Sequence, residues 1–231
     1  MMRILLGCIA LLFGLPAAAQ PVTLAFLPVV YQQSIPTELP RGLQMVELHA
    51  RCEQCNPWRE INFYGLTEPV RTERVSVSEG YRAMYAFPDT HYFANVKIER
   101  SDTGQFEIDR DLVERGLRHE CQRKLTKVEN YLAENPKVRE KLELIRMPGH
   151  PYVEVEEGTR GGISFIACTE NAIGLISSTI SQVQMFIPSR HLTITAYLLK
   201  QEKMNFRTIE KFRELRDEFI NGYCDFLNKQ Q

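Results

Sequence analysis

Cys52 and Cys55 have the types and spacing most suited to chemistry, in the run Cys-Glu-Gln-Cys. In thiol-disulfide oxidoreductases, a CxxC pair follows a strand and opens a helix, whose N-terminus lowers the pKa of the first thiol. Here Pro57 and Gly65 leave little room for a long helix, and the surrounding residues have a β pattern. We therefore expect Cys52 and Cys55 to form a local structural pair, with thiol-disulfide exchange as the alternative function.

Three further cysteines lie in the second half of the chain, at Cys121, Cys168 and Cys224. With Cys52 and Cys55 they make an odd number, so at least one thiol stays unpaired in an oxidising compartment. Cys121 and Cys224 both fall on or beside apolar faces of expected helices. We expect a disulfide between these two, which would join distant parts of the chain, and a free Cys168.

A zinc site is the competing interpretation of the same cysteines. His119 and Cys121 are the other close His/Cys pair, and a structural zinc ion needs two such pairs. Neighbours two apart on a helix point about 200° away from each other, so these two side chains would not reach one ion. We expect no metal ion and no cofactor. Hydrolase motifs such as G-x-S-x-G and H-E-x-x-H are also absent from the sequence.

The first 19 residues have the pattern of a secretory signal peptide. Arg3 precedes an apolar run from Ile4 to Leu15, and Ala17 and Ala19 satisfy the small-residue cleavage rule. A retained anchor is the alternative, but twelve helical residues span only about 18 Å of a hydrocarbon core of about 30 Å. A lipid-modified Cys8 is another alternative, although too few residues precede it. We expect a mature chain exported from the cytosol, with the bacterial periplasm favoured.

The charge balance gives no reason to expect a nucleic-acid partner. Without residues 1–19 the chain has 27 Lys and Arg against 29 Asp and Glu, a net charge of −2. Affinity for nucleic acid comes largely from cationic side chains that neutralise phosphates. No apolar run after the leader is long enough to span a membrane, so we expect no transmembrane segment in the mature chain.

Residues 20–108 predict a β-rich module. Side chains alternate between apolar and polar around residues 46–51, 74–78, 81–87 and 92–99, and turn residues separate these runs. An antiparallel sheet or small sandwich fits short strands at this spacing. The opening run from Val22 to Tyr31 is expected to be one more strand, with Pro28 at an edge or bulge.

Residues 109–231 predict an α+β module. Apolar residues at three- and four-residue steps indicate a helix from Asp109, its expected N-cap, to Asn135, and a second helix from Pro136. Strands are then expected at 153–156, 163–168 and 192–198. The run 172–187 fits a helix or strands, and we favour a helix. A closing helix is expected over 205–227.

The expected fold class is therefore α+β: an N-terminal antiparallel β module, a helical hairpin, a mixed β/α region and a closing C-terminal helix. The break near residues 100–110 is a domain boundary or the edge of one domain.

The function expected from these patterns is binding rather than catalysis. Aromatic residues anchor protein interfaces when they share an exposed face. The β module contains several candidates, namely Trp58, Tyr64, Tyr85 and Phe93. We expect a non-catalytic, exported protein of the cell envelope that binds another envelope or secreted protein, as an assembly factor, inhibitor or immunity-type protein. A small-ligand carrier with a pocket between the two halves is a further alternative.

Overall fold

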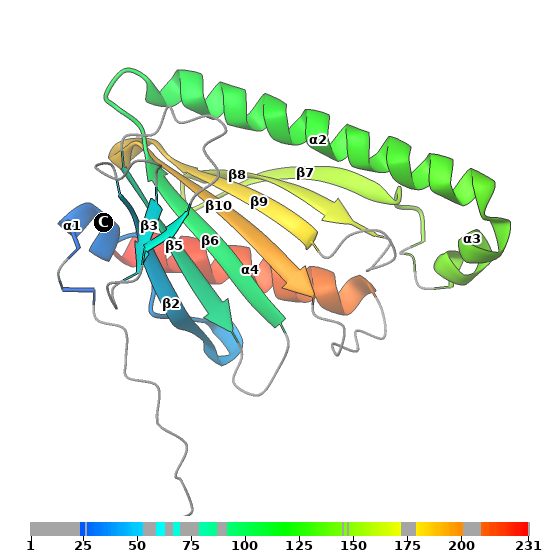
Figure 1. The fold of residues 1–231 in the computed structure, drawn as a ribbon, viewed down its shortest axis with the longest axis horizontal. Coiled ribbons are helices and arrows are strands. Elements are labelled where there is room, and N and C mark those ends of the chain that lie inside the picture. The colour runs from blue at the N-terminus through cyan, green and yellow to red at the C-terminus, as the bar shows by residue number, and fades with distance from the viewer. Residues whose placement is uncertain are drawn as a thin grey trace, which may run out of the picture.

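The computed structural model shows one antiparallel sheet with helices on both faces (Figure 1). It describes residues 24–25, 27–52, 59–62, 67–69, 79–86, 92–144, 146, 148–171, 179–200 and 209–230. Within these residues, the order of the strands across the sheet is β4-β3-β2-β5-β6-β10-β9-β8-β7, and β1 pairs with β2 beside this path. The α+β class expected from the sequence is thus present, and each pair of neighbouring strands in this sheet is antiparallel.

The first half of the chain supplies one side of the sheet. Its elements are the helix α1 (Val29–Gln32) and the strands β1 (Glu38–Leu39), β2 (Leu43–Cys52), β3 (Arg59–Asn62), β4 (Thr67–Pro69), β5 (Glu79–Ala86) and β6 (Tyr92–Arg100). The expected opening strand over 22–31 is wrong, because the chain turns into α1 directly after Pro28. Pro28 has φ −55°, and its carbonyl accepts hydrogen bonds from Tyr31 and Gln32. The strand expected over 74–78 lies outside the described residues.

The second half completes the same sheet. A meander of β7 (Val153–Arg160), β8 (Ile163–Glu170), β9 (Thr179–Ile187) and β10 (Leu192–Lys200) runs inward from the edge of the sheet. β10 then pairs with β6 over nine residues, from Leu192 opposite Arg100 to Lys200 opposite Tyr92. Strands from 20–108 and from 109–231 therefore share one continuous sheet, joined at the β6–β10 pair.

The helical hairpin connects the middle of the sheet to its edge. It consists of α2 (Phe106–Glu134) and α3 (Pro136–Glu143), which follow β6 and precede β7. Both helices were expected, but α2 begins three residues before Asp109. Gln105 is its N-cap, without a side-chain cap, and Asp109 lies inside the first turn. A carboxylate is favourable there because it faces the positive end of the helix dipole.

β9 corrects the helix that was favoured for 172–187. Residues 179–187 form a strand between β8 and β10, and 172–178 lie outside the described residues. Val183 and Met185 pack on one face of the sheet and Phe186 on the other. A strand that is apolar on both faces gives no clear period, so neighbouring strands decided what the sequence left ambiguous.

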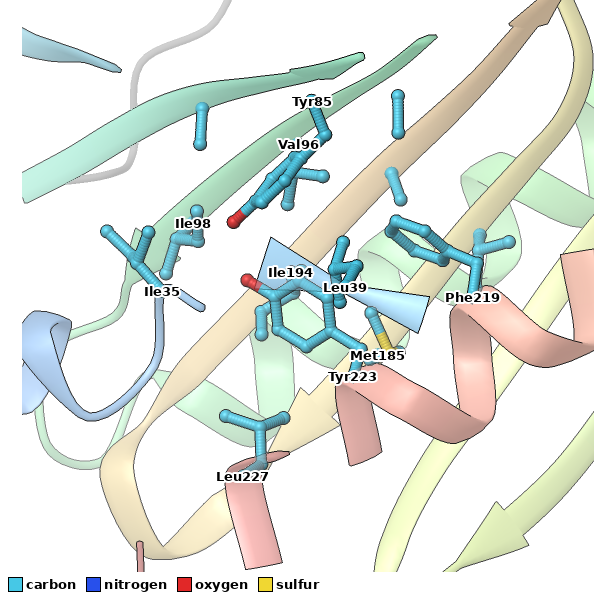
Figure 2. Close-up of a cluster of buried hydrophobic side chains, with 14 of the residues drawn as sticks. Ile35, Leu39, Tyr85, Val96, Ile98, Met185, Ile194, Phe219, Tyr223 and Leu227 are labelled. Atoms are coloured by element: carbon cyan, nitrogen blue, oxygen red, sulfur yellow. The ribbon is translucent and has the colours of Figure 1, made fainter. Parts of the chain in front are cut away.

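Two apolar cores lie on opposite faces of the sheet. The larger core includes α4 (Ile209–Lys229), the described part of the closing helix expected over 205–227, and inward residues of β5, β6, β9 and β10. Figure 2 shows Tyr223 of α4 beside Leu39, Met185 and Ile194 of the same core, which also contains Phe219. The smaller core lies under the hairpin and contains Phe106, Leu117, Cys121, Val128, Leu132, Leu142, Tyr152, Val153, Ile166, Cys168 and Phe186.

Candidate functional site

The disulfide joins Cys121 of α2 to Cys168 of β8, across 5.7 Å between their Cα atoms. The expected Cys121–Cys224 bond is wrong, because α2 and α4 lie on opposite faces of the sheet. Cys224 belongs to the α4 core, whereas Cys121 and Cys168 belong to the core under the hairpin. The free cysteine among these three is thus Cys224 and not Cys168.

The free thiol of Cys224 is poorly suited to nucleophilic chemistry. Its residue is 1% exposed, and burial raises the pKa of the thiol to about 11. A thiol must ionise to attack, so this group stays protonated at neutral pH. Cys224 therefore acts as a small apolar residue of the core.

The CxxC pair stays a prediction. Cys52 is the last residue of β2, where its backbone pairs with Arg59 of β3, and Cys55 lies outside the described residues. The redox alternative for these two cysteines is likewise untested.

The structure places one of the four aromatic candidates for partner binding in the core and leaves the side chains of the other three undescribed. Tyr85 is wrong as a surface residue, because it is fully buried and its hydroxyl donates a hydrogen bond to the Pro36 carbonyl at 2.8 Å. Burial, helped by the neighbouring Tyr223, raises the pKa of Tyr85. Phe93 lies in β6, where its backbone pairs with Leu199 and with β5, and nothing further is described of its side chain. Trp58 and Tyr64 lie outside the described residues.

A network of charged side chains anchors α4 to the outer strands of the sheet. Arg216 is buried, and it donates hydrogen bonds to Glu156, to Asp217 at 2.7 Å and to the Thr169 hydroxyl at 2.8 Å. Arg213 binds Glu156 as well, so the two arginines share one carboxylate of β7. A buried cation with partners for its donors is a structural group rather than an open ligand site.

Glu154 extends this network along the same face of β7. Its carboxylate accepts hydrogen bonds from Arg213 and, at 2.8 Å, interacts with Nδ1 of His150. Burial alone would raise the pKa of Glu154, but the hydrogen bonds from His150 and Arg213 outweigh it and lower the pKa. Arg213 also donates to the Asn171 side chain at 3.2 Å. No sequence pattern pointed to this network, because Arg213 and Arg216 lie within the expected closing helix, where an arginine is normally solvent-exposed.

Ion pairs also fasten α2 to the sheet, beside the disulfide. Lys124 binds Glu170 of β8 at 3.0 Å, and the Glu170 side chain is only 5% exposed. Arg118 binds Glu157 of β7 at a more exposed position. One covalent bond and two ion pairs therefore hold the middle of α2 against β7 and β8.

Two buried oxygen atoms, one in the first turn of α2 and one in β10, have no hydrogen-bond partner among the described residues. They are Oδ2 of Asp109 and Oγ1 of Thr193, in residues that are 8% and 6% exposed. A single ordered water can satisfy groups of this kind. These atoms do not by themselves define a ligand.

Exposed apolar side chains concentrate on the hairpin. Among the residues whose side chains are described, the large exposed ones are Val29, Ile108, Leu112, Tyr131 and Leu144. All except Val29 belong to α2 or directly follow α3. Tyr131 is 40% and Leu144 85% exposed, and Figure 1 shows this end of the hairpin projecting beyond the strands. The apolar period of α2 does not reveal these residues, because it marks the buried stripe of the helix and not its outward side.

The residues around the end of α3 are well packed in spite of the exposure of Leu144. Leu142 is fully buried, and the ring of Tyr152 lies under the Arg146 guanidinium at 5.0 Å. The hydroxyl of Tyr152 donates to the Glu143 carboxylate. The exposed side chain of Leu144 therefore extends from well-packed neighbours.

The outward side of α2 also has a shallow, open depression. It is lined by polar side chains that can donate hydrogen bonds, namely His119, Gln122, Arg123, Thr126, Lys127 and Asn130. No group of three or more metal-ligating side chains occurs in the described parts of the chain. None of the helices in those parts is long and apolar enough to cross a membrane.

Comparison of this chain with protein-family models, with curated proteins and with solved structures finds no match.

Proposed function

We propose that this protein is an exported, non-catalytic binding protein of the cell envelope that engages another envelope or secreted protein through the α2–α3 hairpin. The observation that carries the proposal is the exposure of Tyr131 and Leu144 at the projecting end of the hairpin. Burial of an aromatic and a leucine side chain against a partner supplies the apolar centre typical of protein interfaces.

The attachment of the hairpin supports this proposal. The Cys121–Cys168 bond and the Lys124–Glu170 pair fix α2 to β8, so a partner would meet a surface that is already ordered. Binding to an ordered surface avoids part of the conformational entropy that binding otherwise costs. Export is supported by the leader pattern of residues 1–19 and by a disulfide that is compatible with an oxidising compartment.

The experiment is affinity capture of the processed protein from envelope extracts, after cross-linking in intact cells. Wild type should recover one stoichiometric partner, and Leu144→Asp and Tyr131→Ala should each lose it. Leu112→Asp changes another exposed leucine, on a different part of α2, and is the matched control that should keep the partner. Recovery that is unchanged by both hairpin variants, or no partner at all, contradicts the proposal. N-terminal sequencing of the exported protein should begin at Gln20.

A further inference from the structure

The outward side of α2 contains a glycine that the fold of one chain does not require. Gly116 lies in the middle of the helix, and a Cβ atom added there would meet nothing within 4 Å. Glycine inside a helix costs about 1 kcal/mol relative to alanine. Its use becomes favourable where another backbone or a large side chain must approach closely.

Apolar side chains without a partner lie along the same side of the helix. Ile108 and Leu112 precede Gly116 at four-residue steps and are 55% and 54% exposed. Residues four apart lie one above the other on a helix surface, so these three positions form a short stripe. The exposed side chains of Ile108 and Leu112 thus lie next to the open space above Gly116.

Charges along α2 are complementary when the helix meets a reversed copy of itself. Residues 107–112 have a net charge of −2, from Glu107, Asp109, Arg110 and Asp111, whereas residues 115–123 have a net charge of +2, from Arg115, Arg118, Glu120 and Arg123. The Asp111–Arg115 pair has both side chains more than 60% exposed. Exposed pairs of this kind contribute about 0–1 kcal/mol, so the same groups can exchange partners across an interface.

We propose that two copies of this protein associate through antiparallel α2 helices, around a two-fold axis near Glu114 and Arg115. Residues 107–112 of each copy then lie against residues 116–123 of the other, and Leu112 enters the gap above Gly116 of the second copy. Asp111 then lies near Arg115 of the second copy, which has an exposed guanidinium in this region. A two-fold contact of this type repeats each interaction twice, as closed dimers require.

The depression on α2 fits the same arrangement. It begins at His119 and is lined by donors and cations. The antiparallel pair brings Glu107 and Ile108 of the second copy toward its edge. A parallel, in-register pair would instead place Asp111 against Asp111 and Arg115 against Arg115, which like-charge repulsion disfavours.

The contact involves one helix from each copy, and the dimer is accordingly expected to be weak. Stable interfaces bury about 1,200–2,000 Å² in total, more than a single short helix crossing supplies. We expect a dissociation constant in the micromolar range or above.

Sedimentation velocity of the processed, disulfide-bonded protein over a wide concentration range tests the proposal. Wild type should shift from monomer to dimer, and Leu112→Asp should weaken the dimer by about tenfold or more. Gly116→Leu should weaken it as much, although it removes a helix-breaking residue and should raise the thermal stability of the monomer. That combination distinguishes a blocked contact from a misfolded protein.

Leu144→Asp is the matched control, because it places the same charge on an exposed leucine away from the crossing. It should leave dimerisation unchanged while it disrupts the proposed partner surface, so the two proposals fail separately. A protein that stays monomeric throughout, or a dimer that persists in both Leu112→Asp and Gly116→Leu, overturns the inference.

Discussion

The two faces of the sheet hold their helices in different ways. On one face, α4 covers a broad core in which Tyr223, Ile220 and Leu227 are almost completely buried. The arginine network of Arg213 and Arg216 holds the N-terminal half of α4 against β7. On the other face, α2 covers a narrower core and is fastened at its middle by a disulfide and by ion pairs. One helix is held mainly by buried area and the other largely by a covalent bond.

This difference explains why the exposed apolar residues lie on α2. A helix of 29 residues is about 43 Å long, and only part of it rests on β7, β8 and β9. A covalent bond lets a helix stay in place without burying a wide apolar face. The rest of its surface is then available for partners, whereas residues of the α4 core cannot be exposed without loss of the fold.

The largest effect is expected from the α4 core. Tyr223→Ala removes a fully buried ring and its hydrogen bond to the Ser34 carbonyl, which should lower the free energy of unfolding by about 3–5 kcal/mol. Tyr223→Phe is the control and should cost about 1 kcal/mol, since only the hydrogen bond is lost. Denaturant unfolding measures both, and equal costs would contradict a packing role for the ring.

The second-largest loss of stability is expected from removal of the Cys121–Cys168 disulfide. The bond closes a loop of 47 residues, so the Cys121→Ser/Cys168→Ser double variant should lose up to about 4 kcal/mol by the chain-entropy model. Hydrogen exchange should increase in α2 much more than in α4. Equal loosening of both helices would show that the two faces are not held independently. Cys224→Ser is a control for the free thiol and should not change the exchange of α2.

A smaller loss is expected from the arginine network. Arg216→Met keeps the aliphatic volume but leaves Glu156 with Arg213 as its remaining partner, which should cost about 2 kcal/mol. Arg123→Met, at an exposed i,i+3 pair with Glu120, is the matched control and should leave the free energy of unfolding unchanged within measurement error. If both substitutions cost the same, burial does not distinguish the two ion pairs.

The smallest effect concerns pH. The pKa of Glu154 is lowered in the folded protein, since the His150 and Arg213 hydrogen bonds outweigh the effect of burial. Its contribution to stability is therefore complete above the ordinary pKa of 4.5 and is lost as the pH falls through the lower, folded-state pKa. Glu154→Gln should flatten the decline in unfolding midpoint below that pH. A decline as steep as in wild type would exclude Glu154 as a contributor.

Local patterns in the sequence were sufficient for elements with one buried face. The period of three and four in residues 113–132 predicted α2, and strict alternation predicted β6, β7 and β10. Asn135-Pro136 marked the break between α2 and α3, because proline cannot continue the preceding helix but can begin the next one. The presence of mixed α and β structure followed from these patterns.

Elements buried on both faces, and all pairings between distant residues, depended on the tertiary structure. Thr179–Ile187 became a strand because β8 and β10 satisfy its backbone on both sides. Cys121 pairs with Cys168 and not with Cys224 because the sheet separates α2 from α4. Tyr85 is buried, and not part of a binding surface, because it packs in the core that α4 covers. A sequence shows which face of an element is apolar, but only the packed sheet decides what covers that face, and so which cysteines meet and which side chains stay exposed.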